Sequence, residues 1–193
     1  MPEESIDSRI RKGGFIRGLI LGCIVLALSI VSFYFITSAS TTPVVALVVL
    51  YGFSTAIPLA ATVLFAINLR INLGGYWTFK QAVTGTFIMV FCSYILLLIG
   101  RDLVFVKLIE PDMAQKTEAA MLKNSAIMYK QQGIAQAQID TKIADMKKQF
   151  GDGQGTSAGG LIFAFVETTI LLFLLAVLIG AVVKKEPPVF AKS

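Results

Sequence analysis

The sequence predicts an all-α integral membrane protein, a single membrane domain whose four transmembrane helices form two hairpins. Two observations lead to this prediction. Apolar residues make up 55% of the 193-residue chain and charged residues only 15%, which is more apolar and less charged than a soluble domain. The apolar residues also gather in four runs, each with the roughly 20 residues that a helix needs to cross a bilayer. A soluble helical insertion is expected between the third and fourth helices, outside the cytoplasm.

The first transmembrane helix is expected over 15–37, directly after a basic segment. This arrangement favours an uncleaved anchor, because the apolar run is longer than that of a signal peptide and a second run follows at once. Gly14, Gly18 and Gly22 recur every fourth residue and so share one helix face. The spacing allows close approach of another helix, although glycine is also simply common in membrane helices. The spacing alone leaves both interpretations open.

The second helix is expected over 43–69, and Pro58 inside it predicts a kink, because proline cannot donate a backbone hydrogen bond. A short loop with Gly74 and Gly75 and three aromatic residues then suits a membrane surface. Thr78 and Gln81 have the spacing of a capping box, which starts a third helix over 79–106. This helix can continue to Ile109, since the pattern stays apolar.

Residues 112–150 have mixed charge and many helix-forming residues, which indicates a soluble insertion, and Gly133 is expected to divide it into two helices. The second of these carries a narrow apolar stripe of Ile139, Ile143, Met146 and Phe150. The stripe is expected to pack on its partner helix or to lie on the bilayer, and docking of a membrane or periplasmic protein partner is the alternative. A glycine-rich connector, 151–160, leads to the fourth helix, 161–183.

The distribution of basic residues predicts which side of the membrane each loop occupies. Basic residues flank the start of the first helix, the loop after the second and the end of the fourth, whereas the linker between helices one and two has no charge. Since basic loops stay in the cytoplasm, both termini are expected there and the insertion on the other side.

The composition excludes several function classes. The chain has no histidine, which removes histidine-ligated haem, histidine-based zinc sites and histidine general bases. Its two cysteines, Cys23 and Cys92, lie inside apolar runs, where they act as small hydrophobic residues. No catalytic motif, metal site or cofactor fingerprint is present, so we do not expect an enzyme. Positive charges lie beside apolar runs rather than in a dense patch, so no nucleic-acid partner is expected.

The candidate functional residues are charged side chains within or beside the membrane. Glu167 lies about two turns inside the fourth helix, where a carboxylate costs several kcal/mol unless it is paired, protonated or in water. Arg101 is expected at a similar depth, so the two residues would pair, with Thr168 completing a polar cluster. The cluster would either fix the register of two helices or bind a proton, ion or lipid headgroup. Arg70 and Lys80 are expected to contact lipid phosphates at the inner surface.

Two functions are therefore compatible with the sequence. The first is a non-catalytic membrane accessory or scaffold protein, whose insertion presents a surface to a partner or to the bilayer. The alternative is a small oligomeric transporter, or a translocator of lipid-linked substrates, with a pathway lined by Glu167 and Arg101.

Three short motifs stand out along the chain: Lys12-Gly13-Gly14 with Gly18-Leu19-Ile20, the segment 70–82 with Gly74-Gly75-Tyr76 and Phe79, and Glu110-Pro111-Asp112. They resemble motifs of the DUF4199 family of bacterial four-helix membrane proteins. Glu110 departs mildly from the aspartate that commonly precedes this proline in the family. The resemblance covers nearly the whole chain and implies a four-helix fold in a bacterial inner membrane. The family has no established activity, so no site residue is carried over from it.

Overall fold

The part of the protein that the computed structural model describes, residues 5–38, 42–154 and 158–186, is mostly helical. The elements follow in the order α1 (Ile6–Ser38), α2 (Pro43–Tyr51), η1 (Gly52–Ala56), α3 (Ile57–Asn72), α4 (Phe79–Leu97), η2 (Leu98–Ile109), α5 (Met113–Gln131), α6 (Gln136–Gln154) and α7 (Ala158–Val183).

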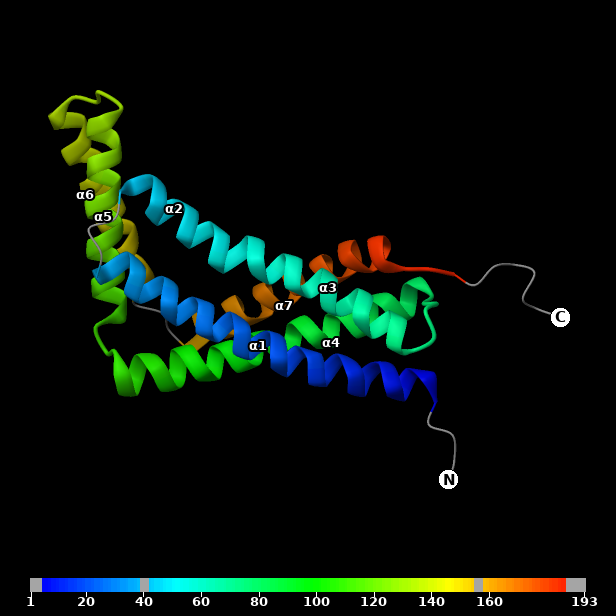
Figure 1. Cartoon of the computed structure of the whole chain (residues 1–193). Coiled ribbons are helices and arrows are strands. Elements are labelled where there is room, and N and C mark those ends of the chain that lie inside the picture. Colours follow the sequence, from blue (N-terminus) through cyan, green and yellow to red (C-terminus); the bar gives the residue numbers. More distant parts are fainter. Residues whose placement is uncertain (1–4, 39–41, 155–157, 187–193) are drawn as a thin grey trace.

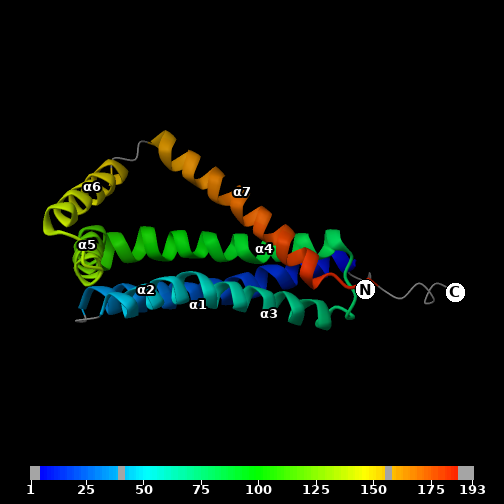
Figure 2. The ribbon, with the colours of Figure 1, turned by 90° about the horizontal axis from the view of Figure 1, so that it is seen from above.

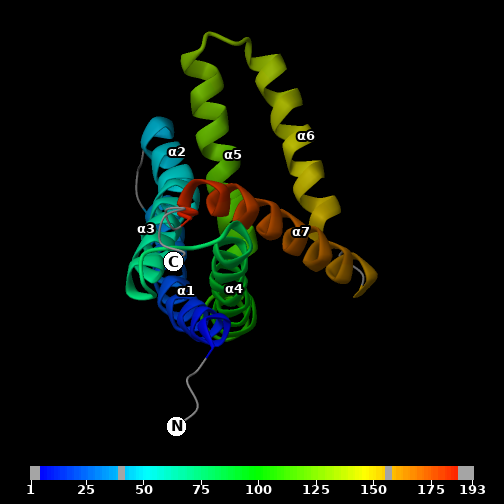
Figure 3. The ribbon, with the colours of Figure 1, turned by 90° about the vertical axis from the view of Figure 1, so that its right-hand side faces the viewer.

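Four continuous helical stretches are long and apolar enough to cross a membrane, which confirms the predicted class. They are Ile6–Thr37, Pro43–Asn72, Phe79–Ile109 and Gly159–Val183. Figure 1 shows that α1, the α2–α3 helix and α4 run side by side. Helix α7 packs most closely on the others at its C-terminal end and diverges from α4 toward its N-terminal end (Figure 2). Helices α5 and α6 lie across the far end of the bundle and form a V when seen along its axis (Figure 3). The start of α1 and the end of α7 lie together at the opposite end.

The glycine row of α1 packs against α4. A Cβ atom added at Gly18 would lie 2.6 Å from the carbonyl oxygen of Met89 and 2.8 Å from the Cβ of Cys92. Gly14 and Gly22 face the α4 backbone in the same way, at Gly85 and Ser93. The spacing therefore marks a close helix–helix contact, and this resolves the alternative that the sequence left open.

Two segments of the spans are π-helical. The disruption expected at Pro58 takes the form of η1, in which the N–H of Ile57 donates to the carbonyl of Gly52, five residues earlier. The third span does continue to Ile109, but its last 12 residues form η2, and the N–H of Glu110 donates to the carbonyl of Phe105 at 2.9 Å. The sequence analysis did not anticipate a π-helix, a geometry that is rare and often found at functional sites.

The loop between α3 and α4 is tied to the segment after α7. The predicted capping box is present, with reciprocal hydrogen bonds between Thr78 and Gln81. Trp77 is fully buried, instead of lying in the interfacial position that its neighbours suggested. The backbone N–H of Trp77 donates to the carbonyl of Lys185 at 2.7 Å, and the backbone N–H of Lys185 donates to the carbonyl of Trp77 at 3.1 Å. This isolated β-bridge fastens the end of α7 to the bundle.

The insertion is a helical hairpin that breaks at Gly133, where φ is +74°. Ile139 of the apolar stripe is buried, and the other three members are half-buried, as α6 packs against α5. The expected packing on the partner helix therefore holds for Ile139, whereas Met146 lines a cleft beside α2 and Phe150 lines a cleft beside η2. The glycine-rich connector is shorter than expected, because α6 continues to Gln154 and α7 begins at Ala158; residues 155–157 lie outside the described part.

Candidate functional site

Glu167 lies on the face of α7 that points away from the rest of the protein. Ala176, Ile179 and Gly180 are buried against α4, and a Cβ added at Gly180 would meet Val83 at 2.8 Å. Glu167 precedes Ala176 by nine positions. At about 3.6 residues per turn this is roughly two and a half turns, so the two side chains project in opposite directions.

Exposure supports this direction. Only 11% of the most apolar stretch of α7 is buried, the smallest share among the four spans. Leu171 is 58% exposed and Leu178 is 66% exposed, and both share the side of the helix that carries Glu167. We call this surface the away face; it comprises Phe163, Glu167, Leu171, Leu174 and Leu178. Its centre is therefore a carboxylate surrounded by apolar side chains that no described residue covers.

Arg101 does not pair with Glu167. Its Nε donates to the carboxylate of the next residue, Asp102, at 2.7 Å, and both side chains are partly exposed. Both line a cleft of about 410 Å³ between η2 and the α5–α6 hairpin, together with Glu118 and Phe150. The expected pair rested on equal depth alone, but the two side chains also need to face each other. They do not, because Glu167 points away from the bundle and Arg101 lies beside the insertion.

The hydroxyls next to Glu167 also do not gather around it. Thr169 donates to the carbonyl of Phe165, one turn earlier in the same helix, at 2.8 Å. Thr168 is half-buried on the side of α7 that faces the bundle. Phe165 itself packs near Tyr94 of α4, with ring centroids 5.9 Å apart. The predicted polar cluster of Glu167, Arg101 and Thr168 is therefore not assembled in this structure.

Arg70 has an internal partner rather than a free position at the membrane surface. Its Nη1 donates to the carbonyl of Val183, the last residue of α7, at 2.6 Å. A cation there stabilises the partial negative charge at a helix C-terminus. Lys80, the other residue expected to contact lipid phosphates, is exposed. Of these two residues, only Lys80 keeps the position that a headgroup contact requires.

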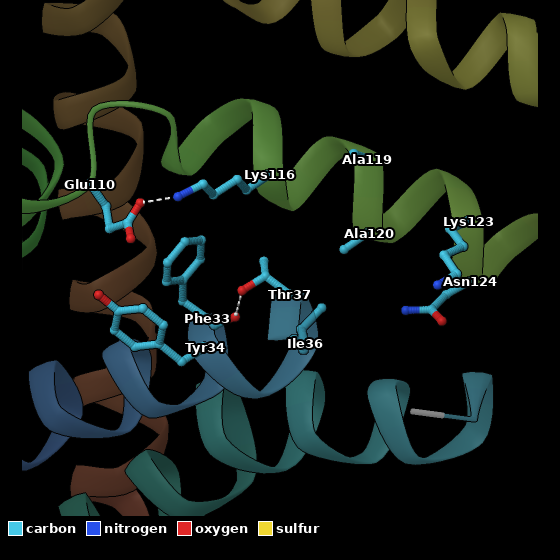
Figure 4. Close-up of a pocket in the computed structure, with 10 residues that line it drawn as sticks. All are labelled: Phe33, Tyr34, Ile36, Thr37, Glu110, Lys116, Ala119, Ala120, Lys123 and Asn124. Carbon is cyan, nitrogen blue, oxygen red and sulfur yellow. Dashed lines mark hydrogen bonds and ion pairs between the residues drawn. The ribbon is translucent and has the colours of Figure 1, made fainter. Parts of the chain in front are cut away.

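A second candidate region, which the sequence analysis missed, lies between α5 and the end of α1. Here a cleft of about 450 Å³ is bordered by Phe33 and Tyr34 of α1 and by Lys116, Lys123 and Asn124 of α5 (Figure 4). The Nζ of Lys116 donates to the carboxylate of Glu110 at 2.5 Å, and this hydrogen bond raises the pKa of Lys116. The residues from α1 and α5 are far apart in the sequence, so no local motif indicates this cleft. The only available signal was the helical spacing of the residues within α5.

Together these features define a class: a multi-pass, all-helical membrane protein with a helical hairpin at one end of four spans. Residues 17–185 match the family described as "Protein of unknown function (DUF4199)". The chain belongs to this family, as its motifs suggested. No curated protein and no solved structure matches it.

Proposed function

We propose that the protein is a non-catalytic accessory or scaffold protein of a bacterial inner membrane, and that it holds a second membrane protein against the away face of α7. The observation that carries this proposal is the direction of Glu167. An unpaired carboxylate that faces hydrocarbon costs several kcal/mol, so a helix that presents one is expected to gain a partner there. A partner helix with a hydrogen-bond donor at the same depth satisfies the carboxylate and covers the surrounding leucines.

The insertion is a weaker docking surface than the sequence suggested. Ile139 of its apolar stripe is buried in the hairpin, and Met146 and Phe150 line clefts that face α2 and η2 of the same chain. Helix α7, in contrast, leaves Leu178 and Phe163 exposed along the whole side that Glu167 occupies. The membrane-embedded helix is thus the better candidate for the partner contact.

A transport pathway between Glu167 and Arg101 receives no support from the geometry. Arg101 lines the cleft beside the insertion, and Glu167 is not among the described residues that line that cleft. A pathway with both residues would need a further copy of the chain, with its Arg101 opposite the away face.

Photocrosslinking in native membranes tests the proposal. A photoreactive amino acid at Leu171 is expected to give one discrete adduct with another protein, because it lies one turn from Glu167 on the away face. Val48 of α2, 65% exposed, is the matched control on a span surface that carries no charge, and it is expected to give lipid adducts only. Glu167→Leu should abolish the Leu171 adduct, while Glu167→Gln, which can still hydrogen-bond, should reduce it less.

Three results would contradict the proposal. Lipid adducts alone from Leu171 would mean that no protein covers the away face. A discrete adduct that survives Glu167→Leu would mean that the carboxylate does not hold the partner. An adduct with the mass of two copies of the chain would show self-association instead of an accessory role.

A further inference from the structure

Two clefts of opposite chemistry meet beneath α5, at the end of the bundle that carries the insertion. The first, of about 450 Å³, is the cleft of Figure 4, between α5 and the end of α1. The second, of about 270 Å³, lies between α5, α6 and the first turns of α2. Ile36 and Asn124 line both, so the two are neighbours with a shared wall. Their volumes are on the order of those of ligand sites in proteins, about 300–1,000 Å³.

The first cleft, which we call the polar cleft, carries a net positive charge. Its charged side chains are Glu110, Lys116 and Lys123, two cations against one anion. Glu110 is already paired with Lys116. Lys123 is exposed and makes no ion pair with a described residue, and in Figure 4 it extends from α5 beside the amide of Asn124. An ammonium group and an amide next to each other form a binding site for an anionic oxygen.

The second cleft, which we call the methionine cleft, is apolar. Met121 and Met128 of α5 and Met146 of α6 face Leu47 and Tyr51 of α2 across it. Methionine side chains are flexible and adapt to apolar ligands of irregular shape. Pro43 begins α2, and Tyr51 lies eight residues further along, so this wall follows α2 for about 12 Å at ~1.5 Å per residue.

We propose that the two clefts together bind one anionic phospholipid, with its phosphate at Lys123 and Asn124 in the polar cleft and an acyl chain in the methionine cleft. A polar cleft that adjoins an apolar cleft suits a ligand with a charged headgroup and an acyl chain better than a free anion or a purely apolar molecule. The polar cleft lies where the first and third spans end, between Thr37 and Glu110, which is the level of the lipid headgroups in a spanning protein. From there the methionine cleft follows a spanning helix, as an acyl chain does.

Native mass spectrometry of the delipidated full-length protein tests the proposal by titration with phosphatidylglycerol and with phosphatidylcholine. One phosphatidylglycerol molecule is expected to bind about fivefold or more tightly than phosphatidylcholine. Lys123→Gln should remove this preference, weakening phosphatidylglycerol binding about fivefold, the effect of one lysine at a charged membrane surface. Lys130→Gln is the matched control, because it removes the same charge from the same helix but lines neither cleft.

The acyl chain has its own tests. Ser125→Phe fills the methionine cleft and should weaken the binding of both lipids, with Lys123 intact. Inorganic phosphate should not displace the bound lipid, because it cannot occupy the methionine cleft. Equal weakening of phosphatidylglycerol binding by Lys123→Gln and by Lys130→Gln would overturn the headgroup site. This comparison does not depend on whether the Ser125→Phe variant folds. Displacement by inorganic phosphate would show a simple anion site instead.

Discussion

Arg70 and Glu167 are two charges associated with α7, and only Arg70 has a partner among the described residues. Its guanidinium reaches the last carbonyl of the helix, at Val183, across 113 residues of sequence. Glu167 faces outward, opposite the packed side of the same helix. One charge therefore anchors α7 within the chain, and the other is available to a partner.

Removal of the Arg70 side chain is expected to loosen the end of α7. Arg70→Met deletes a hydrogen bond from a charged donor, which costs about 1.5–3 kcal/mol of stability. We expect a lower thermal unfolding midpoint in detergent and faster hydrogen exchange over the last turn of α7. Lys80→Met is the matched control, since Lys80 is exposed on the following helix and should change stability by less than about 0.5 kcal/mol. Unchanged exchange in Arg70→Met would show that this contact does not hold the helix.

The contact between α1 and α4 depends on glycine, and this dependence can be tested. In Gly18→Ala the new methyl group meets the backbone of Met89, which cannot move out of the way as a side chain could. We expect a loss of about 1–3 kcal/mol of stability, measured as thermal unfolding in detergent. Gly52→Ala is the control, because no atom lies within 4 Å of the added Cβ. This control should be neutral or up to about 1 kcal/mol stabilising; equal losses in both variants would contradict a packing role for Gly18.

The sequence predicted those features of the helices that depend on residue spacing within one segment. The pair of Thr78 and Gln81 has the fixed spacing of a capping box, and that prediction was confirmed. The glycine row of α1 also has a fixed helical spacing, but the sequence left its meaning open and the structure decided for close packing against α4. The direction of Glu167 has no such signal, because α7 is apolar on nearly all sides and its hydropathy does not distinguish the packed face. Ala176 and Gly180, small residues four positions apart, were the available clue to that face.

The molecule as a whole has two different ends. The β-bridge between Trp77 and Lys185 and the start of α1 lie at one end, and the α5–α6 hairpin lies at the other (Figure 1). The sequence predicted that the insertion lies at the end opposite the two termini, because it follows the third of four spans. The clefts beneath α5 were not predictable, because they form where α1, α2 and α5 meet in three dimensions and no single segment carries their pattern.

The proposed orientation can be checked by thiol labelling of intact cells. In a background with Cys23→Ala and Cys92→Ala, a membrane-impermeant maleimide should label Gln132→Cys, in the turn of the hairpin, without permeabilisation. Glu186→Cys, just after α7, should react only once the membrane is opened, because the basic ends of the spans are expected in the cytoplasm. The reverse pattern would invert the orientation, and labelling of both sites in intact cells would contradict placement of the two ends on opposite sides.

The contacts at the end of α7 have a consequence for the opposite leaflet. Val183 lies 16 residues after Glu167, which is about 24 Å along a helix at ~1.5 Å per residue. An α-helix resists twisting about its own axis, so the contacts of Arg70 and Trp77 at one end of α7 restrict rotation of the whole helix. They thereby determine the direction in which Glu167 points, near the other surface of the membrane. A residue that never approaches Glu167 thereby determines which neighbour Glu167 can meet.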